Sequence, residues 1–315
     1  MYNAVGLPSQ VRKSDFQLAL TEEVNMKRLT GSIALLVLLA VGVSGIAVGQ
    51  DNTFPPPKVL SITREFTKPG KSGTPHEKTE SAFVQAMANA KWPTHYLAVE
   101  SLSGKSRALF LTGYDSFAAW EKDALASQKN ATLSSALDRA WAADGELLSE
   151  TDATALVFRP EYSLRAAVDI PHMRYFEISL YQVRHGHDKD WDEIVKLVTA
   201  AYEKIPDVHW ATYAVVYGLQ GNTYVIFNPM KSAEEIDKGF AQGKEFEAAM
   251  GESGMKKLGE LSAAAIESSQ TNLFAFNPRM SYVSEDWIKA DPDYWKPKAT
   301  HMAAKKPAEK PADSH

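Results

Sequence analysis

The sequence predicts an α+β fold made of two copies of one domain in tandem. Two observations indicate the duplication. A strand-like run at residues 59–70 is matched by a second at 175–186, and each leads into a helix start of the type His-acid-Lys. The closing runs at 154–163 and 272–281 also correspond, because both place proline and serine after an apolar stretch. A repeat of roughly a hundred residues is too long for a solenoid unit and indicates a duplicated domain.

The N-terminal segment has the features of a secretory signal. Met26-Lys27-Arg28 is a short basic start, residues 33–43 are apolar, and small residues precede Gln50. We therefore predict that residues 1–25 are a mis-assigned extension and that residues 26–49 are a signal peptide cleaved after Gly49. The chain would then be periplasmic or secreted. The alternative is an uncleaved anchor, since this uncharged run approaches the roughly 20 residues that span a bilayer.

Composition narrows the class of protein. The chain has no cysteine, so its core must be held by packing rather than by disulfides or thiolate metal sites. Its formal net charge is −5 with both signs mixed along the chain, and it has no basic stripe. Nucleic acid is therefore not an expected partner. Residues 50–58 are predicted to be a Pro-rich linker, and residues 296–315 a disordered tail.

The second copy, residues 173–283, shows its element order clearly. Apolar residues Phe176, Ile178 and Leu180 alternate with polar ones, which predicts a strand with one buried face. Helical spacing follows from Trp191 to Tyr202. The remaining predicted elements are strands at 211–217 and 223–227, a helix in two pieces at 232–266 that is interrupted at 251–254, and a strand at 272–276.

The first copy, residues 59–165, repeats this β-α-β-β-α-β order, which is the split βαβ pattern of ferredoxin-like folds. Thr74-Pro75-His76-Glu77 reads as a capping box with proline at the first helical position. The predicted elements are strands at 59–66, 96–99, 107–111 and 154–158, and helices at 77–89 and 116–143.

A split βαβ sheet with one apolar and one mixed face, present twice, resembles the dimeric α+β barrel superfamily. The strand end Val183-Arg184-His185-Gly186-His187 before a helix is similar to the strand-turn-helix entry of that group. The superfamily includes antibiotic-biosynthesis-type monooxygenases, chlorite-dismutase-like haem proteins and NIPSNAP-like proteins. The resemblance covers most of residues 59–283 and implies that two sheets close face to face into a barrel. In this chain the two halves would form it together, with residues 164–172 crossing between them.

Candidate ligand-binding residues concentrate in the second copy. Glu177, Tyr181 and Tyr213 lie on strand faces, His187 opens the first helix, and His209 precedes a strand. A mostly apolar pocket with a few polar groups is the usual form of a small-molecule site. We therefore predict a ligand pocket near these residues, between sheet and helices. The alternative is that such polar side chains satisfy one another.

Histidine residues can bind a metal ion or haem, but the sequence favours neither in this chain. His76 and His187 hold equivalent places, but polar residues are common in a helix's first turn. His185 and His187 lack a second metal-binding motif, and the first copy has Pro69 in place of His185, so we predict no metal site. Haem proteins of the superfamily resemble one another in placing an axial histidine on a helix against the sheet. The long helical stretches here contain none, so no cofactor is predicted, with haem bound through His209 as the alternative.

These observations leave two functions open. The first is a barrel that binds a small apolar or aromatic molecule, either as a monomer with an intramolecular barrel or as a homodimer. The second is a small cofactor-free monooxygenase or haem-handling enzyme. No nucleophile elbow, Walker loop, dinucleotide fingerprint or zincin motif is present, so the sequence does not decide whether the chain is an enzyme. Residues 284–295 are predicted to cover the barrel as an aromatic-rich arm.

Overall fold

The computed structural model describes residues 53–296. The predictions for residues 1–25, for the signal or anchor at 26–49, and for all but the first residue of the 296–315 tail lie outside these residues and stay predictions. Within the described part, no helix combines the length and the apolar character needed to cross a membrane.

The first half contains four strands and three helices. Along β1, Leu60 and Ile62 are buried while Ser61 and Thr63 are half-buried, which places the two apolar residues on one face. The elements are β1 (Val59–Thr67), α1 (Thr74–Ala90), β2 (Tyr96–Ser101), β3 (Arg107–Tyr114), α2 (Phe117–Lys129), α3 (Ala131–Asp144) and β4 (Leu148–Phe158).

The second half repeats the order after two short 3₁₀ turns, η1 (Pro160–Tyr162) and η2 (Ile170–His172). Its elements are β5 (Tyr175–Val183), α4 (Asp188–Tyr202), β6 (Ala211–Tyr217), β7 (Thr223–Met230), α5 (Glu234–Ala265) and β8 (Ile266–Phe276), followed by α6 (Glu285–Ala290) and α7 (Pro292–Trp295).

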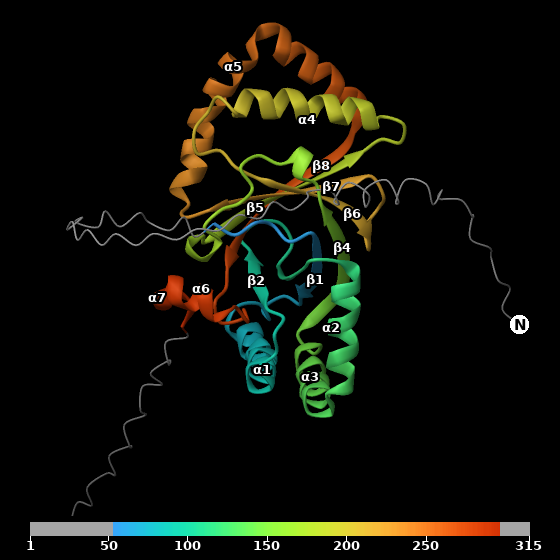
Figure 1. The fold of residues 1–315 in the computed structure, drawn as a ribbon, viewed down its shortest axis with the longest axis vertical. Coiled ribbons are helices and arrows are strands. Elements are labelled where there is room, and N and C mark those ends of the chain that lie inside the picture. Colours follow the sequence, from blue (N-terminus) through green and yellow to red (C-terminus); the bar gives the residue numbers. More distant parts are fainter. Residues whose placement is uncertain (1–52, 297–315) are drawn as a thin grey trace, which may run out of the picture. The chain divides into compact units, whose positions relative to one another are not determined.

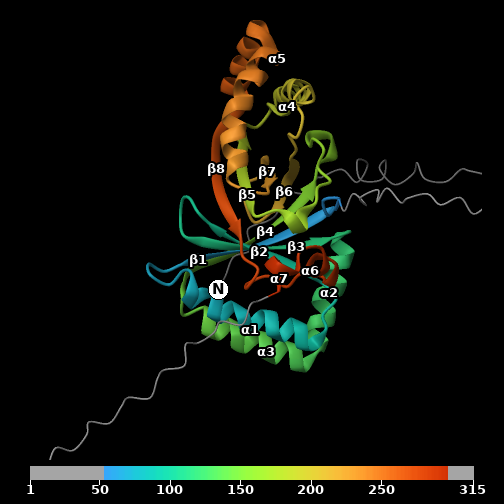
Figure 2. The ribbon, with the colours of Figure 1, turned by 90° about the vertical axis from the view of Figure 1, so that its left-hand side faces the viewer.

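All eight strands form one closed antiparallel barrel in the order β1-β3-β2-β8-β5-β7-β6-β4. Each half supplies a four-stranded sheet, and the two sheets meet where β2 pairs with β8 and where β4 pairs with β6. The predicted α+β barrel of two ferredoxin-like repeats is thus confirmed, and it closes within one chain. Helices α1–α3 cover the outside of the first sheet, and α4 and α5 cover the outside of the second, on the opposite side of the barrel (Figures 1 and 2).

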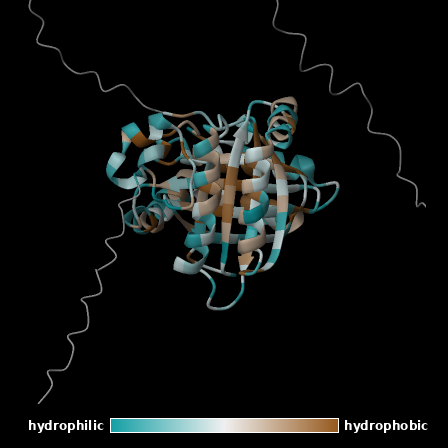
Figure 3. Cartoon of the chain, turned by 90° about the horizontal axis from the view of Figure 1, so that it is seen from below, coloured by the Kyte–Doolittle hydropathy of each residue, from teal (hydrophilic) through white to brown (hydrophobic). Residues whose placement is uncertain are grey.

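The main core fills the inside of the barrel. Inward positions such as Leu60, Ile62, Phe176, Ile178 and Phe274 are nearly inaccessible to solvent and belong to one apolar cluster. In the view from below, hydrophobic colour gathers on the central strands while hydrophilic colour predominates in peripheral loops (Figure 3). Closure leaves no free sheet edge. Polar side chains such as Arg64 and Arg107 lie beside these core residues where they line a second cavity.

The seam between β4 and β6 depends on a close backbone approach. Gly218 follows β6 with a φ of +89°, and a Cβ there would lie 2.0 Å from the Ala153 carbonyl oxygen. Only glycine tolerates both the left-handed backbone and this contact.

Two local sequence predictions were wrong. The capping box of α1 does not form, because Gly73 is the N-cap and no side chain caps the helix. The Glu77 carboxylate instead accepts hydrogen bonds from Asn277 and Arg279, both of which lie beyond β8. The single helix expected at 116–143 is divided at Asn130, whose side chain caps α3 by accepting a hydrogen bond from the Leu133 amide.

Other elements follow the predicted pattern with longer strands. Helix α5 is bent where expected, because Gly251 has a φ of 66° and a ψ of 169° inside it. The bend allows α5 to arch over α4 (Figure 1). Strands β4 and β8 begin at Leu148 and Ile266, earlier than the apolar pattern indicates. The pattern misses the first part of each strand because most residues there are polar and exposed.

Both flanking segments pack against one end of the barrel. Trp295 of α7 is buried, and its indole N–H donates to the Pro171 carbonyl at 2.8 Å. Phe54 of the Pro-rich linker pairs with Val168 through the backbone and meets the Trp287 ring edge-on. The linker and the aromatic arm therefore share in closing that end.

Candidate functional site

The second half contains a cleft between the outer face of its sheet and the helices α4 and α5. Its volume is about 550 Å³, which is within the size range of small-molecule sites. The alternation of β5 brings Glu177, Ser179 and Tyr181 to this face, opposite the residues that fill the barrel. Most other lining side chains are aliphatic or aromatic: Trp191, Ile194, Val195, Val198, Tyr202, Trp210, Ile226, Phe240 and Leu258 are among them.

Glu177 is the acidic group that the sheet contributes to this cleft, and Glu235 of α5 also lines it. Glu177 pairs across the sheet with Asn228 of β7, which also lines the cleft. Within residues 53–296 its carboxylate makes neither a hydrogen bond nor an ion pair, and burial raises its pKa. Burial, and then the charge of Glu177, also raises the pKa of the Tyr181 phenol. The cleft therefore offers a hydrogen-bond acceptor without a protein partner in a largely apolar setting.

Trp191 of α4 supplies part of the apolar wall. Its ring stacks on Tyr224 at a centroid distance of 4.8 Å and lies 5.6 Å from the Tyr181 ring. Its indole N–H has no hydrogen-bond partner in the described part of the chain, but it is inaccessible to solvent. A ligand in the cleft would therefore contact the ring and not this N–H.

The five predicted site residues separate into three places. Glu177, Tyr181 and His209 line the cleft. His187 is the N-cap residue of α4, where its Nδ1 lies 2.7 Å from Asp190 Oδ2 and over a third of its side chain is exposed; it does not line the cleft. Tyr213 faces the barrel interior, where its hydroxyl donates to the Pro57 carbonyl at 3.1 Å and burial raises its pKa.

His209 is held by backbone atoms rather than aimed at a ligand. Its Nε2 lies 2.8 Å from the Pro229 carbonyl oxygen and its Nδ1 lies 3.1 Å from the Asp207 carbonyl oxygen. A neutral imidazole has one N–H and can donate to only one of them. For His209 to ligate a haem iron, the ring would have to give up one of these contacts.

Tyr213 belongs to a separate cavity at the mouth of the barrel. This cavity has a volume of about 490 Å³ and is lined by core residues such as Leu60 and Phe176. Phe54 and Trp287 from the flanking segments also line it, and His209 lies in the wall between this cavity and the cleft. The cleft contains the Glu177 carboxylate, which has no hydrogen-bond or ion-pair partner within residues 53–296, whereas no acidic side chain lines the barrel mouth in that part of the chain.

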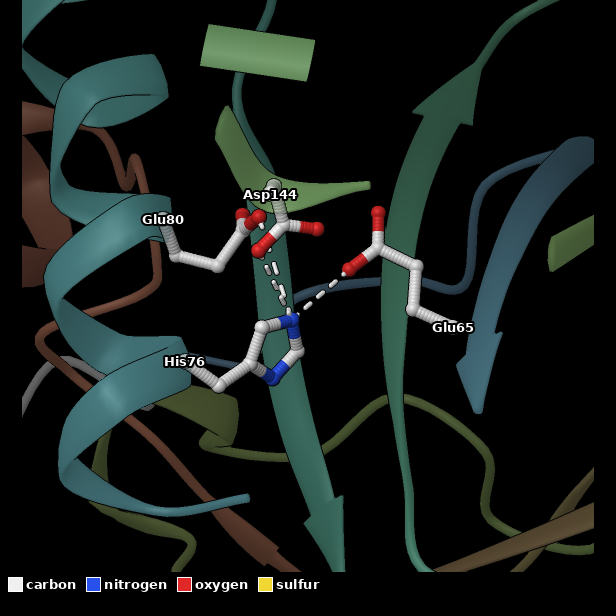
Figure 4. Close-up of side chains that lie close together, drawn as sticks. All are labelled: Glu65, His76, Glu80 and Asp144. Atoms are coloured by element: carbon white, nitrogen blue, oxygen red, sulfur yellow. Dashed lines mark hydrogen bonds and ion pairs between the residues drawn. The ribbon is translucent and has the colours of Figure 1, made fainter. Parts of the chain in front are cut away.

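Four further polar side chains meet beneath the helices of the first half. Glu65 of β1, His76 and Glu80 of α1, and Asp144 of α3 are at most 3% exposed. Figure 4 shows the carboxyl groups gathered around one edge of the imidazole ring. His76 Nε2 lies 3.0 Å from Glu65 Oε2, 3.5 Å from Asp144 Oδ1 and 4.0 Å from Glu80 Oε1. We call these four residues the His76 cluster.

Burial and mutual charge shift the ionisation of the His76 cluster. Burial, followed by the charges of Glu65 and Asp144, raises the pKa of Glu80 to about 9. Burial also raises the pKa of Glu65. Burial alone would lower the pKa of His76, but hydrogen bonds to Asp144 and Glu65 outweigh it and raise that pKa to about 10. At neutral pH a proton on Glu80 therefore offsets part of the negative charge that three ionised carboxyl groups would place in this buried cluster.

Sequence reasoning missed this cluster, although part of its signal was present. His76 and Glu80 are four residues apart and so lie on one helix face, and Glu65 occupies an outward position of the preceding strand. Asp144 comes from the end of a different helix, and only the fold brings it to the others.

No protein-family model and no curated protein matches the sequence. Solved structures similar to the chain include a proposed monooxygenase from Fusobacterium nucleatum, at 11% identity and a TM-score of 0.47, covering 70% of this chain and 93% of that one. Another, from Lactobacillus acidophilus, has 7% identity and a TM-score of 0.42, covering 70% and 94%. A mutant chlorite dismutase from Candidatus Nitrospira defluvii has 10% identity and a TM-score of 0.43, covering 74% and 95%.

At such identities and TM-scores the likeness carries no argument, and the assignment of the fold rests on the strand order itself. The fold is an α+β barrel.

Replacing Glu177 with glutamine should change how stability depends on pH. Because burial raises the folded-state pKa of Glu177 above its ordinary value of 4.5, its ionisation opposes folding at neutral pH, and this effect disappears as the pH falls through the folded pKa. We expect E177Q to be more stable than wild type at pH 8, with a difference that shrinks as the pH approaches about 4.5. Urea unfolding of both chains across this range measures it.

Glu193 provides the matched control on the same half of the molecule. The hydrogen bond from Lys257 lowers the pKa of Glu193, so ionised Glu193 favours folding. Any difference in stability should therefore have E193Q less stable than wild type at neutral pH, and it should disappear at acidic pH. An E177Q chain that is less stable than wild type at pH 8 would contradict the assignment of Glu177 as an unpaired, half-buried carboxylate.

Proposed function

We propose that the second half of the barrel binds a small aromatic molecule carrying a hydroxyl group, in the cleft between its sheet and helices α4 and α5. The observation that carries this proposal is the unpartnered Glu177 carboxylate on the floor of an apolar cleft of about 550 Å³. A hydroxyl donor would satisfy that carboxylate, and the aromatic rings of Trp191 and Tyr181 suit a flat apolar body.

The volume of the cleft and the positions of its side chains favour a single ligand that spans the cleft over several smaller molecules. Cavities of roughly 300–1,000 Å³ bury most of a drug-sized molecule. Glu177 lies on β5 and Trp191 on α4, so a ligand between them would contact sheet and helix together.

Binding of 2-naphthol and of naphthalene to the full-length chain tests the proposal through quenching of tryptophan fluorescence. We expect 2-naphthol to bind more tightly than naphthalene and E177Q to weaken 2-naphthol binding by roughly tenfold or more, because a hydrogen bond to a charged group contributes about 1.5–3 kcal/mol. Naphthalene binding should not change in E177Q.

Tyr213→Phe is the control, since it alters the barrel-mouth cavity and leaves the cleft intact. If Y213F weakens 2-naphthol binding and E177Q does not, the ligand occupies the barrel mouth and the proposal is wrong. It is also wrong if neither compound binds.

A cofactor-free oxygenase reaction in the same cleft is the second candidate. The raised pKa of Glu177 favours it, because such a carboxylate can serve as a general base near neutral pH. It would take a proton from a phenolic or enolic substrate and leave an electron-rich anion able to reduce O₂.

Oxygen consumption with anthrone separates the two candidates. Oxidation of its CH₂ group to a carbonyl consumes one O₂ and releases one water, giving anthraquinone. An oxygenase should consume O₂ faster than buffer alone and lose this activity in E177Q. A chain that binds 2-naphthol but leaves the rate of O₂ consumption unchanged would be a binding protein.

A further inference from the structure

The His76 cluster has the spacing of a metal-coordination shell. A tetrahedral ion with bonds of about 2.1 Å holds its ligand atoms about 3.4 Å apart, and octahedral ligands stand about 3.0 or 4.2 Å apart. The distances from His76 Nε2 to the three carboxylates, 3.0, 3.5 and 4.0 Å, cover this range. All four ligand atoms lie within 4.8 Å of one another, so small side-chain shifts would bring them around one ion.

The charges of the cluster do not balance by themselves. With its three carboxyl groups ionised and His76 neutral, which is the state that binds a metal, the cluster carries a charge of −3. These side chains are almost fully buried, and a buried charge without a partner is strongly unfavourable. A single His76 Nε2–H can donate to only one of the three carboxylates that surround it. A divalent cation would remove most of the imbalance and could contact all three.

Buried oxygens in the cluster lack hydrogen-bond partners within residues 53–296 and so have bonding capacity left for a cation. Glu80 Oε1 and Asp144 Oδ2 are buried and make no hydrogen bond within residues 53–296. The buried Tyr96 hydroxyl also lacks a partner there, and it lies close enough for the charges of Glu80 and Glu65 to raise its pKa further after burial. Buried polar atoms in native proteins nearly always have a partner, so three without one in one place is unusual.

A supporting hydrogen bond holds one of the carboxylates in position. The Thr79 hydroxyl donates to Asp144 Oδ1 at 2.5 Å, and Thr79 lies on α1 between His76 and Glu80. Hydrogen bonds of this kind orient the ligands in metal sites and are part of their construction.

We propose that Glu65, His76, Glu80 and Asp144 bind one divalent first-row cation of the Zn²⁺, Fe²⁺ or Mn²⁺ class. An imidazole together with three carboxylates suits these ions, whereas Mg²⁺ and Ca²⁺ prefer oxygen ligands alone. The cation links β1, α1 and α3 in the first half. Because the ligands are almost inaccessible to solvent, its main effect is on stability. The site is separate from the cleft of the second half and does not depend on the ligand proposed there.

Metal content and thermal unfolding of the full-length chain test this proposal. The chain is treated with a chelator, dialysed against Zn²⁺, Mn²⁺, Fe²⁺ without oxygen, or Mg²⁺, and examined by elemental mass spectrometry and calorimetry. We expect one equivalent of a first-row ion to be retained, and Tm to rise by roughly 5–10 °C at a free ion concentration of a hundred times Kd. Mg²⁺ should bind less tightly.

Glu80→Gln removes one ligand charge with little change of shape. We expect E80Q to bind the ion at least a hundredfold less tightly and to lose the metal-dependent rise in Tm. His187→Gln is the matched control, because His187 also lies at the start of a helix beside an aspartate, but is partly exposed. It should retain one equivalent of metal and the full rise in Tm.

Two results would overturn the proposal. One is a wild-type chain that retains less than about a tenth of an equivalent of every ion and shows no change in Tm. The other is an E80Q chain that binds metal as wild type does, since the ion would then lie elsewhere. The wild-type measurement alone is decisive if E80Q fails to fold, and either result leaves 2-naphthol binding in the cleft unaffected.

Discussion

Closure of the barrel between the two halves is the constraint on which the rest of the structure depends. Two short ladders achieve it, β2 with β8 and β4 with β6. They enclose the apolar faces of both sheets in one core. With the interior filled by packing and no sheet edge left free, each half has one other buried surface, which lies between the outer face of its sheet and its helices. Both candidate sites occupy that surface.

The two halves have used equivalent positions for different chemistry. Glu65 and Tyr181 hold the same place on the first strand of each half, and Glu80 and Trp191 the same place on the first helix. In the second half the two rings lie 5.6 Å apart and form the wall of an apolar cleft. In the first half the two carboxyl groups face His76, where we propose that a cation binds. The duplication thus provides one scaffold, on which differences at equivalent positions separate the proposed ligand cleft from the proposed metal site.

Local pattern explains how much was predictable from the sequence. The alternation of Phe176, Ile178 and Leu180 predicted both the strand and the place of Glu177 on the opposite face, because side chains of a strand alternate with a period of two. Closure within one chain was implied by resemblance to a superfamily, since seam pairs such as Val99 with Phe276 join residues far apart in sequence. The His76 cluster was missed for the same reason. Its fourth member, Asp144, approaches only after α3 has packed beside α1.

Disulfide trapping across the β4–β6 seam tests intramolecular closure most directly. Val157 and Ala214 are paired residues there, and the chain has no cysteine of its own, so V157C/A214C introduces the only two thiols. Paired positions on neighbouring strands are near the separation that a disulfide requires. After oxidation in dilute solution, intact mass under non-reducing conditions should show a single chain that has lost two hydrogens and no longer reacts with a thiol reagent, while V157C alone keeps its thiol. A covalent dimer bridged through this pair would show that two chains exchange halves and would contradict the account.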